Sequence, residues 1–200
     1  MAVSAPTAAE AKPIRLVAFG DSLTAGYGLP KGKGFAPRLE AALRAAGHHV
    51  EVIDAGVSGD TSDGGLARLD WSVPADAQAV IVELGANDAL RGLPPTETRR
   101  NIDEIVARLT ARRQTVLVAG MLAPRNLGES YTRAFDPIFA EVAKAHGALL
   151  YPFFLDGVAL DAKLVQADGS HPTADGVEVI VARILPTVRE LLARVEAARP

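Results

Sequence analysis

The sequence predicts an α/β protein with a central, mainly parallel sheet and helices on both faces. Short runs rich in β-branched and apolar residues alternate with longer stretches of helical periodicity, from residue 14 to the last helical pattern. Strands that alternate with helices pair in parallel through right-handed crossovers, which places helices on both faces of the sheet. A chain of 200 residues, 48% of them hydrophobic, can bury one substantial core, so we expect a single domain.

Five apolar runs are the expected strands, and five periodic segments are the expected helices. The strands are expected at 15–19, 50–54, 79–83, 115–119 and 148–151. The helices are expected at 34–46, 63–69, 96–112, 131–146 and 173–197. Gly47 and Gly147 each follow a helical pattern, as C-terminal caps do.

The first residues differ in composition from the rest of the chain. Residues 1–12 are rich in Ala, Ser, Pro and Thr, without the charged start and apolar run of a signal peptide. We expect a flexible leader over 1–12 and one folded domain over 13–200. A removed signal peptide and a new methionine would leave the same composition. The expected location is therefore periplasmic or secreted in that case, and cytoplasmic otherwise.

Composition and charge exclude several classes of function. The net charge of −3 arises from 21 basic and 24 acidic residues spread along the chain, so no cationic surface for nucleic acid is indicated. The absence of cysteine excludes disulfides, thiolate metal sites and a cysteine nucleophile. The apolar stretch 177–185 is well short of the roughly 20 residues needed to cross a bilayer, so no stable membrane insertion is expected.

Residues suited to chemistry follow the first three predicted strands. In an open α/β sheet the ligand crevice lies at the carboxyl ends of the strands. The segments after those ends are 20–23 (Gly-Asp-Ser-Leu), 56–60 (Gly-Val-Ser-Gly-Asp) and 85–88 (Gly-Ala-Asn-Asp). We therefore expect the functional site at this edge of the sheet.

Ser22 is a candidate nucleophile. A serine that ends a buried strand and begins a turn places its hydroxyl in the crevice and leaves its backbone N–H free for a ligand. Serine is also a frequent helix N-cap, and for an isolated Gly-Asp-Ser this second interpretation is the commoner one. The motif alone does not establish chemistry.

The segment 168–172, Asp-Gly-Ser-His-Pro, places a carboxylate three residues before an imidazole. One loop can then bring an Asp168 oxygen to His171 Nδ1, which fixes the tautomer and stabilises the imidazolium that forms when the other nitrogen accepts a proton. Pro172 restricts His171 to extended conformations before the next helix. Taken alone, the segment is equally a surface turn with an incidental histidine.

An acyl-transfer site also needs N–H donors for the oxyanion that forms as a carbonyl becomes tetrahedral. Three donors are available: the backbone N–H groups of Ser22 and Gly59 and the side-chain amide of Asn87. Singly, Gly59 is an ordinary turn glycine and Asn87 an Asx turn. A nucleophile, an acid–base pair and these donors at the ends of successive elements together predict an acyl-transfer site.

With these blocks the sequence resembles the SGNH hydrolases, also called GDSL esterases or lipases. The four marker residues of that family fall, in order along the chain, on Ser22, Gly59, Asn87 and His171. This resemblance implies Ser22 as nucleophile, His171 as base and then acid, and Asp168 as the residue that orients it. Ser22, Gly59 and Asn87 are the implied oxyanion donors.

Three further stretches, 58–62, 65–69 and 82–85, resemble the bacterial multifunctional branch of that family. This branch is known as a periplasmic acyl-CoA thioesterase, lysophospholipase and arylesterase. The resemblance implies a flavodoxin-like three-layer α/β/α sandwich with a five-stranded sheet, and no cofactor. It implies an aryl ester, a short to medium acyl ester, an acyl-CoA or a lysophospholipid as substrate.

Three aspartates stand close to these blocks. We expect Asp21 to brace the nucleophile turn and Asp88 to brace the Asn87 loop, although each is also a common turn residue. Asp54 departs from the family pattern, in which many members have asparagine. It is not a marker residue, so the departure concerns the turn geometry more than the reaction.

Apolar loops beside the site are the expected walls for an acyl chain. They are 89–95, 122–131 and 151–158, with Arg91 or Arg125 near a polar head group. The sequence leaves the chain length and the oligomeric state open.

Several aromatic and imidazole groups are left outside the predicted site. Phe153 and Phe154 are counted as core aromatics on burial statistics. His48, His49 and His146 lie beside glycine at helix ends, where a cation is mildly favourable. No metal-ligand spacing is present, so no metal is expected.

Two other functions remain open at this point. A carbohydrate acetylesterase would use the same blocks, since SGNH members also deacetylate sugars. A non-catalytic module that binds phosphate or nucleotide would use 20–28 as an anion-binding loop. That loop lacks the Gly-Lys-Ser/Thr ending of a P-loop, and this function leaves Asp168 and His171 unexplained.

Overall fold

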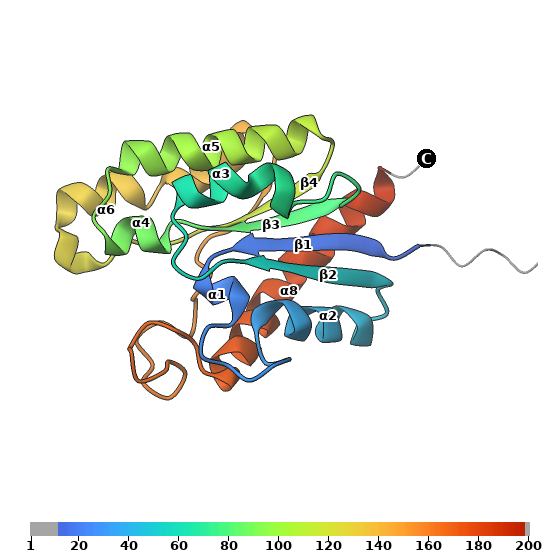
Figure 1. Ribbon diagram of the computed structural model, residues 1–200, viewed down its shortest axis with the longest axis horizontal. Helices are drawn as coiled ribbons and strands as arrows, with labels where there is room; N and C mark the ends of the chain where they lie inside the picture. Colours follow the sequence, from blue (N-terminus) through green and yellow to red (C-terminus); the bar gives the residue numbers. More distant parts are fainter. Residues whose placement is uncertain (1–11, 199–200) are drawn as a thin grey trace, which may run out of the picture.

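Five parallel strands form one sheet in the computed structural model, which describes residues 12–198. In the order β2-β1-β3-β4-β5, the strands are β2 (Val50–Gly56), β1 (Ile14–Gly20), β3 (Ala79–Glu83), β4 (Thr115–Ala119) and β5 (Leu149–Tyr151). Helices cover both faces (Figure 1), so the predicted α/β/α fold is confirmed. The expected leader lies outside the described residues except for Lys12.

The central strands are buried because both of their faces are covered. Every residue of β3 is buried, and β1 is buried from Leu16 onward, as near-continuous apolar runs predict. Leu16 pairs with Val52 on one side and with Ala79 on the other, which sets the register of β2, β1 and β3. Their carboxyl ends therefore lie side by side.

The helices form two layers. One face carries α2 (Phe35–Ala45) and α8 (Ala174–Ala197), and the other carries α3 (Ser62–Ser72), α5 (Pro95–Ala111) and α7 (Ile138–Ala145), as Figure 1 shows for the labelled elements. Within the described chain, none of these helices combines the length and the apolar character that crossing a bilayer requires.

The prediction of one helix over 131–146 is wrong. The segment contains two helices, α6 (Glu129–Phe135) and α7, which are separated at Asp136 and Pro137. Proline has no N–H for the carbonyl four residues earlier, and its ring clashes with that carbonyl, so a helix does not run through it undisturbed. Figure 1 shows α6 near the carboxyl ends of the strands.

Three short elements at the carboxyl edge were not predicted. They are α1 (Ser22–Ala25), α4 (Ala86–Leu90) and the 3-10 helix η1 (Arg125–Leu127). Elements of three to five residues are too short to show a helical period in sequence. Each directly follows a strand or lies in a loop after one, so together they form the floor and walls of the crevice.

Gly20 allows α1 to pack closely against the end of β3. A Cβ atom at this position would lie 2.1 Å from Thr24 Oγ1 and 2.6 Å from the Glu83 carbonyl oxygen. The missing side chain lets the chain turn from β1 into α1 without leaving the sheet. The Gly-Asp-Ser-Leu motif therefore fixes Ser22 directly above the strand end.

Candidate active site

Ser22 is the first residue of α1, and Asp21 is the helix cap. The Asp21 carboxylate accepts a hydrogen bond of 2.9 Å from the Leu23 N–H, which is the usual N-cap contact. The interpretation of Ser22 as the N-cap is therefore excluded by this geometry. Its hydroxyl is left free for another partner.

The structure brings Ser22, His171 and Asp168 into one hydrogen-bonded chain. Ser22 Oγ lies 2.8 Å from His171 Nε2, and His171 Nδ1 lies 2.7 Å from Asp168 Oδ2. A carboxylate at Nδ1 keeps the proton on that nitrogen, so Nε2 is free to accept the hydroxyl proton. The predicted juxtaposition of these three residues is present.

Asp168 is held as a carboxylate by a local turn. The backbone N–H of His171 and that of Ser170 each donate 3.0 Å hydrogen bonds to Asp168 Oδ1. These contacts, followed by the His171 side chain, lower the pKa of Asp168 well below its usual value. The group opposite the imidazole is thus ionised across the neutral range.

Gln166 and Tyr27, which were not predicted, attach this turn to the nucleophile side. Gln166 Nε2 donates to the Tyr27 carbonyl at 2.8 Å, while the Gln166 N–H donates to the His171 carbonyl at 2.7 Å. The Tyr27 ring lies 4.6 Å from the His171 ring. A glutamine two residues before the Asp-Gly-Ser-His block gives no distinct sequence signal, so only the fold reveals this contact.

Two backbone N–H groups in the segments that follow β1 and β2 are candidate donors for an oxyanion. Within residues 12–198, the N–H groups of Ser22 and Gly59 donate no hydrogen bond to the protein. Gly59 adopts φ +85°, a left-handed conformation that favours glycine. Its carbonyl accepts a 2.7 Å hydrogen bond from Arg91, which fixes the orientation of this peptide.

The Asn87 side-chain amide is the third candidate donor, but it is already hydrogen-bonded to protein groups. Asn87 Nδ2 lies 3.0 Å from Asp21 Oδ2 and 2.9 Å from the Asp60 carbonyl oxygen. An amide nitrogen has two N–H groups. To donate to a substrate, Asn87 must share one of them or exchange one of these partners.

A buried pair of carboxyl groups lies under α1. Burial raises the pKa of Asp21 to about 6, against the opposing effect of hydrogen bonds from the Leu23 N–H and Asn87. Burial and the neighbouring Asp21 carboxylate raise the pKa of Glu83 well above its usual value. Glu83 accepts a 2.7 Å hydrogen bond from Thr24 Oγ1. Glu83 was missed, although an acidic residue ending an apolar strand is itself an unusual signal.

Asp88 connects the start of α3 with α5. It accepts hydrogen bonds from the Ser62 N–H at 2.8 Å and from Thr98 Oγ1 at 3.0 Å, and it is buried. These contacts tie the Asn87 segment to the start of α3 and to α5.

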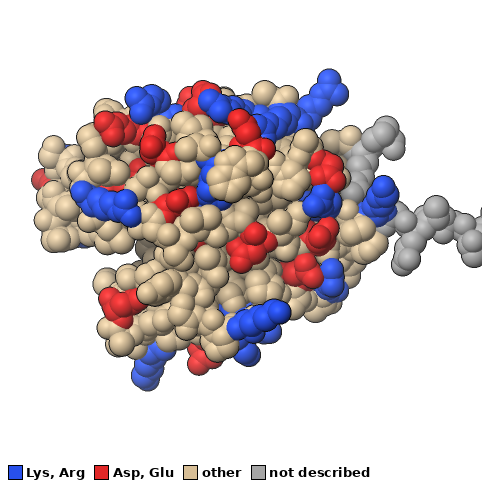
Figure 2. Space-filling model, in the orientation of Figure 1, with Lys and Arg blue, Asp and Glu red and all other residues tan. Residues whose placement is uncertain are grey.

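A cavity of about 480 Å³ opens beside Ser22. Its walls are mainly apolar, and Figure 2 shows a hollow where the loop after β5 faces α4 and α6. The lining residues outside the hydrogen-bonded group include Leu90, Met121, Leu122, Pro124, Arg125, Phe153, Leu155 and Leu160. All three predicted loops contribute to this wall.

Of the two adjacent phenylalanines, one lies in the core and one does not. Phe154 is fully buried and packs edge-on against Phe35, whereas Phe153 lines the cavity. The expectation that both are core aromatics therefore holds for Phe154, whereas Phe153 is only partly buried. Of the two predicted arginines, Arg125 lines the cavity, and Arg91 supports Gly59.

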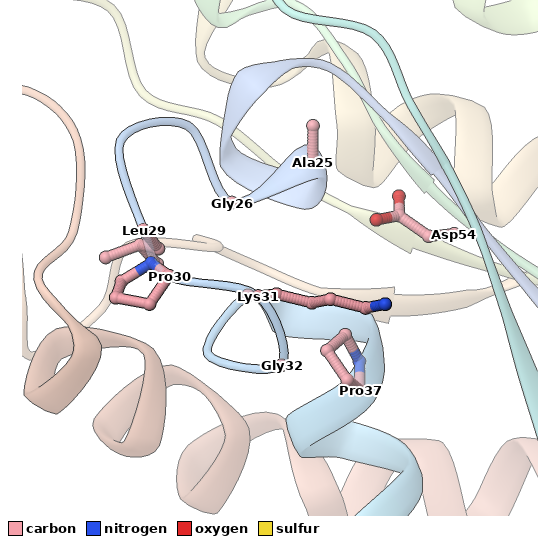
Figure 3. Close-up of a pocket in the computed structure, with 9 residues that line it drawn as sticks. Ala25, Gly26, Leu29, Pro30, Lys31, Gly32, Pro37 and Asp54 are labelled. Carbon is pink, nitrogen blue, oxygen red and sulfur yellow. The ribbon is translucent and has the colours of Figure 1, made fainter.

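A second hollow of about 370 Å³ lies at the other end of α1 and includes Asp54 (Figure 3). Asp54 Oδ1 accepts a 2.9 Å hydrogen bond from the Gly56 N–H, a contact that an asparagine oxygen would also make. The departure from the family pattern therefore leaves the turn intact. Among the described residues, no group of three or more His, Asp or Glu side chains is arranged to hold a metal ion.

Comparison with known proteins agrees with this geometry. Residues 18–179 match the model of the GDSL-like Lipase/Acylhydrolase family. Esterase TesA of Pseudomonas aeruginosa strain PAO1 is 36% identical over 178 residues, which cover 88% of this chain and 89% of the relative. Thioesterase 1/protease 1/lysophospholipase L1 of Escherichia coli K12 is 35% identical over 161 residues, covering 80% and 76%.

Solved structures give the same result. The crystal structure of TesA has a TM-score of 0.84 at 35% identity and covers 88% of this chain and 99% of its own. The crystal structure of AlinE4, an SGNH-hydrolase family esterase, has a TM-score of 0.77 at 45% identity and covers 92% and 99%. The chain therefore belongs to the GDSL-like lipase/acylhydrolase family, the SGNH hydrolases, and is an ester-hydrolysing enzyme.

Proposed function

We propose that this hydrolase transfers the acyl group of its substrate to Ser22 and then to water. The observation that carries the proposal is the continuous chain from Ser22 Oγ through His171 to the Asp168 carboxylate. His171 Nε2 takes the hydroxyl proton as Ser22 Oγ forms a bond to the carbonyl carbon. The resulting imidazolium faces the ionised Asp168 and gives its proton to the departing alcohol or thiol when the bond to that group breaks.

The second half of the reaction repeats these steps with water. His171 removes a proton from a water molecule whose oxygen attacks the acyl carbon, and the same proton returns to Ser22 Oγ as the acid leaves. In both halves the carbonyl oxygen becomes negative. The free N–H groups of Ser22 and Gly59, together with Asn87, are the donors available to it.

We infer an acyl chain of short to medium length as the bound part of the substrate. The cavity beside Ser22 is mainly apolar, and its volume suits one such chain. The relatives are named as an esterase, an arylesterase and a thioesterase/lysophospholipase, which are activities on acyl esters and thioesters. A sugar acetylester would leave these apolar walls unused, so the acyl-ester substrate is preferred.

The proposal is tested with Ser22→Ala and with a set of p-nitrophenyl esters of increasing chain length. The variant is expected to lose turnover by a factor of about 10⁴ or more, because the attacking oxygen is removed, with unchanged thermal unfolding, because only one oxygen of a half-buried side chain is lost. The matched control is Ser58→Ala, which removes an exposed hydroxyl from the loop next to Gly59. A phenylphosphonate ester should label Ser22 in the unaltered enzyme.

Two results would overturn this proposal. One is retained turnover in Ser22→Ala, and the other is labelling at a residue other than Ser22. A maximum of kcat/KM at a chain of two carbons, with no gain up to eight, would instead reject the acyl-chain assignment. Stabilisation by a nucleotide without ester turnover would favour the non-catalytic module.

A further inference from the structure

Arg68 is a buried cation that the proposed reaction does not use directly. It lies on α3, and only 6% of its side chain is exposed. All of its guanidinium nitrogens have partners: Nη2 donates to the Gly20 carbonyl at 2.7 Å, Nη1 to the Ala55 carbonyl at 2.9 Å, and Nε to Asp60 Oδ2 at 2.5 Å. A buried charge is costly unless it is paired and hydrogen-bonded, so this arrangement is specific.

The three acceptors belong to the segments that carry the backbone oxyanion donors. Gly20 lies two residues before Ser22, and Asp60 directly follows Gly59. The planar guanidinium holds both segments at once, since its N–H groups point in fixed directions. The guanidinium also lies 4.3 Å above the Phe19 ring, which limits its movement.

Asn87 closes this arrangement into a ring. Its amide contacts Asp21 Oδ2 at 3.0 Å and the Asp60 carbonyl at 2.9 Å, while Arg68 connects Asp60 back to Gly20, the residue before Asp21. The ring therefore passes through the loops after β1, β2 and β3. These loops carry the three candidate oxyanion donors.

We propose that Arg68 is a positioning residue that sets the spacing between the Ser22 N–H and the Gly59 N–H. This inference rests on the proposed function, in which those two groups hold the oxyanion. Donors must lie within a few tenths of an ångström of the place where negative charge develops, and small displacements reduce the rate strongly. The acyl chain binds in the cavity on other residues, so Arg68 affects the transition state more than substrate binding.

The central variant is Arg68→Lys, which keeps the charge but cannot reach Gly20, Ala55 and Asp60 together. We expect kcat to fall by roughly tenfold to hundredfold on a p-nitrophenyl ester, with KM changed by less than about twofold. The matched control is Arg38→Lys, which changes an arginine paired with Glu178 between α2 and α8. It is expected to keep the kcat of the unaltered enzyme.

A thionoester substrate separates positioning from a merely structural role. Its carbonyl oxygen is replaced by sulfur, which is larger and accepts hydrogen bonds weakly, so it gains little from the N–H donors. In the unaltered enzyme the ester should react much faster than the matching thionoester. In Arg68→Lys this ratio should fall by about the same factor as kcat, whereas Arg38→Lys should keep it.

Asp60→Asn tests the same ring of hydrogen bonds from the side of the acceptor. It removes the charged acceptor of Arg68 but keeps the backbone carbonyl that Asn87 contacts. If both residues act through one ring, the double variant Arg68→Lys with Asp60→Asn should lose little more activity than the worse single variant.

The proposal is overturned if folded Arg68→Lys keeps the kcat of the unaltered enzyme. It is also overturned if kcat falls while the ester-to-thionoester ratio stays constant, or if the two single effects simply multiply in the double variant. Should Arg68→Lys unfold, Asp60→Asn alone gives the ratio test. Failure of the proposed function would appear differently, because the unaltered enzyme would then not be labelled at Ser22 by the phosphonate.

Discussion

The two sides of the site are built in different ways. On the nucleophile side, Asp21, Thr24 and Glu83 are buried under α1 and are hydrogen-bonded to one another. On the imidazole side, Asp168 and His171 belong to an exposed turn, and their side chains are 40% and 22% exposed. The first side is part of the core, whereas the second is held mainly by contacts within its own loop.

This difference separates stability from reactivity. A change beneath α1 disturbs buried polar groups, which are costly to leave unpaired, so it affects folding as well as turnover. A change in the turn removes contacts that water can replace, so it affects turnover with little effect on folding. Three substitutions test this contrast.

The largest effect is expected for His171→Ala. Turnover of an aryl ester should fall by about 10⁴ or more, because the base in contact with Ser22 Oγ is removed. The free energy of unfolding, measured with urea, should change by less than about 1 kcal/mol. His146→Ala is the matched control, since it also removes an imidazole that is hydrogen-bonded to an aspartate. His146 Nε2 lies 2.8 Å from Asp103 Oδ1 and belongs to no part of the Ser22 site. A large loss of stability in His171→Ala would contradict the contrast.

The second effect concerns pH and Glu83→Gln. Both buried carboxyl groups have raised pKa values in the folded protein, with Asp21 at about 6. Their contribution to stability is therefore fully present below pH 4 and is lost as the pH rises through the folded values. Glutamine stays neutral, can accept from Thr24 Oγ1 and can donate to Asp21. The free energy of unfolding of the variant should exceed that of the unaltered enzyme by on the order of 1–3 kcal/mol at pH 8, and by less at pH 4.

Urea unfolding at pH 4, 6 and 8 measures this difference. A matched control is Asp54→Asn, which neutralises a carboxyl with a raised pKa outside the pair. If Glu83→Gln changes the free energy of unfolding by the same amount at all three pH values, the Asp21–Glu83 pair is not the source of the pH dependence of stability.

The smallest effect is expected for Leu160→Gly in the loop that carries Asp168. Leu160 is 99% exposed and adopts φ +69°, a left-handed conformation that is unfavourable for leucine. Relief of this strain opposes the larger chain entropy of glycine, so the stability should change by less than about 1 kcal/mol. In contrast, Leu23→Ala in α1 should lower the free energy of unfolding by about 2–4 kcal/mol, because Leu23 is buried. Similar losses of stability in Leu160→Gly and Leu23→Ala would contradict the difference between the two sides of the site.

The sequence was sufficient for the sheet but not for every helix. All five strands lie within two residues of their predicted ends, because strands buried on both faces are continuous apolar runs. The prediction of one helix over 131–146 is wrong because apolar periodicity continues across Pro137, where the chain divides into α6 and α7.

The same contrast explains which site residues were found. Ser22, Asp168 and His171 stand in short blocks that are ambiguous singly, and it is their combination with Gly59 and Asn87 that predicts an acyl-transfer site. Arg68 and Glu83 act through partners on other elements, and nothing nearby in the sequence identifies those partners. A charged residue at the end of an apolar strand, such as Glu83, is the signal that could have been followed.

The short spacing in the turn has a consequence for the order in which the site assembles. Asp168 and His171 are three residues apart, so bringing them together costs little chain entropy, whereas Ser22 and His171 are separated by 149 residues. The imidazole and carboxylate can therefore meet before the sheet is complete. The last event in forming the site is then the docking of one finished turn against α1, through Gln166 and Tyr27.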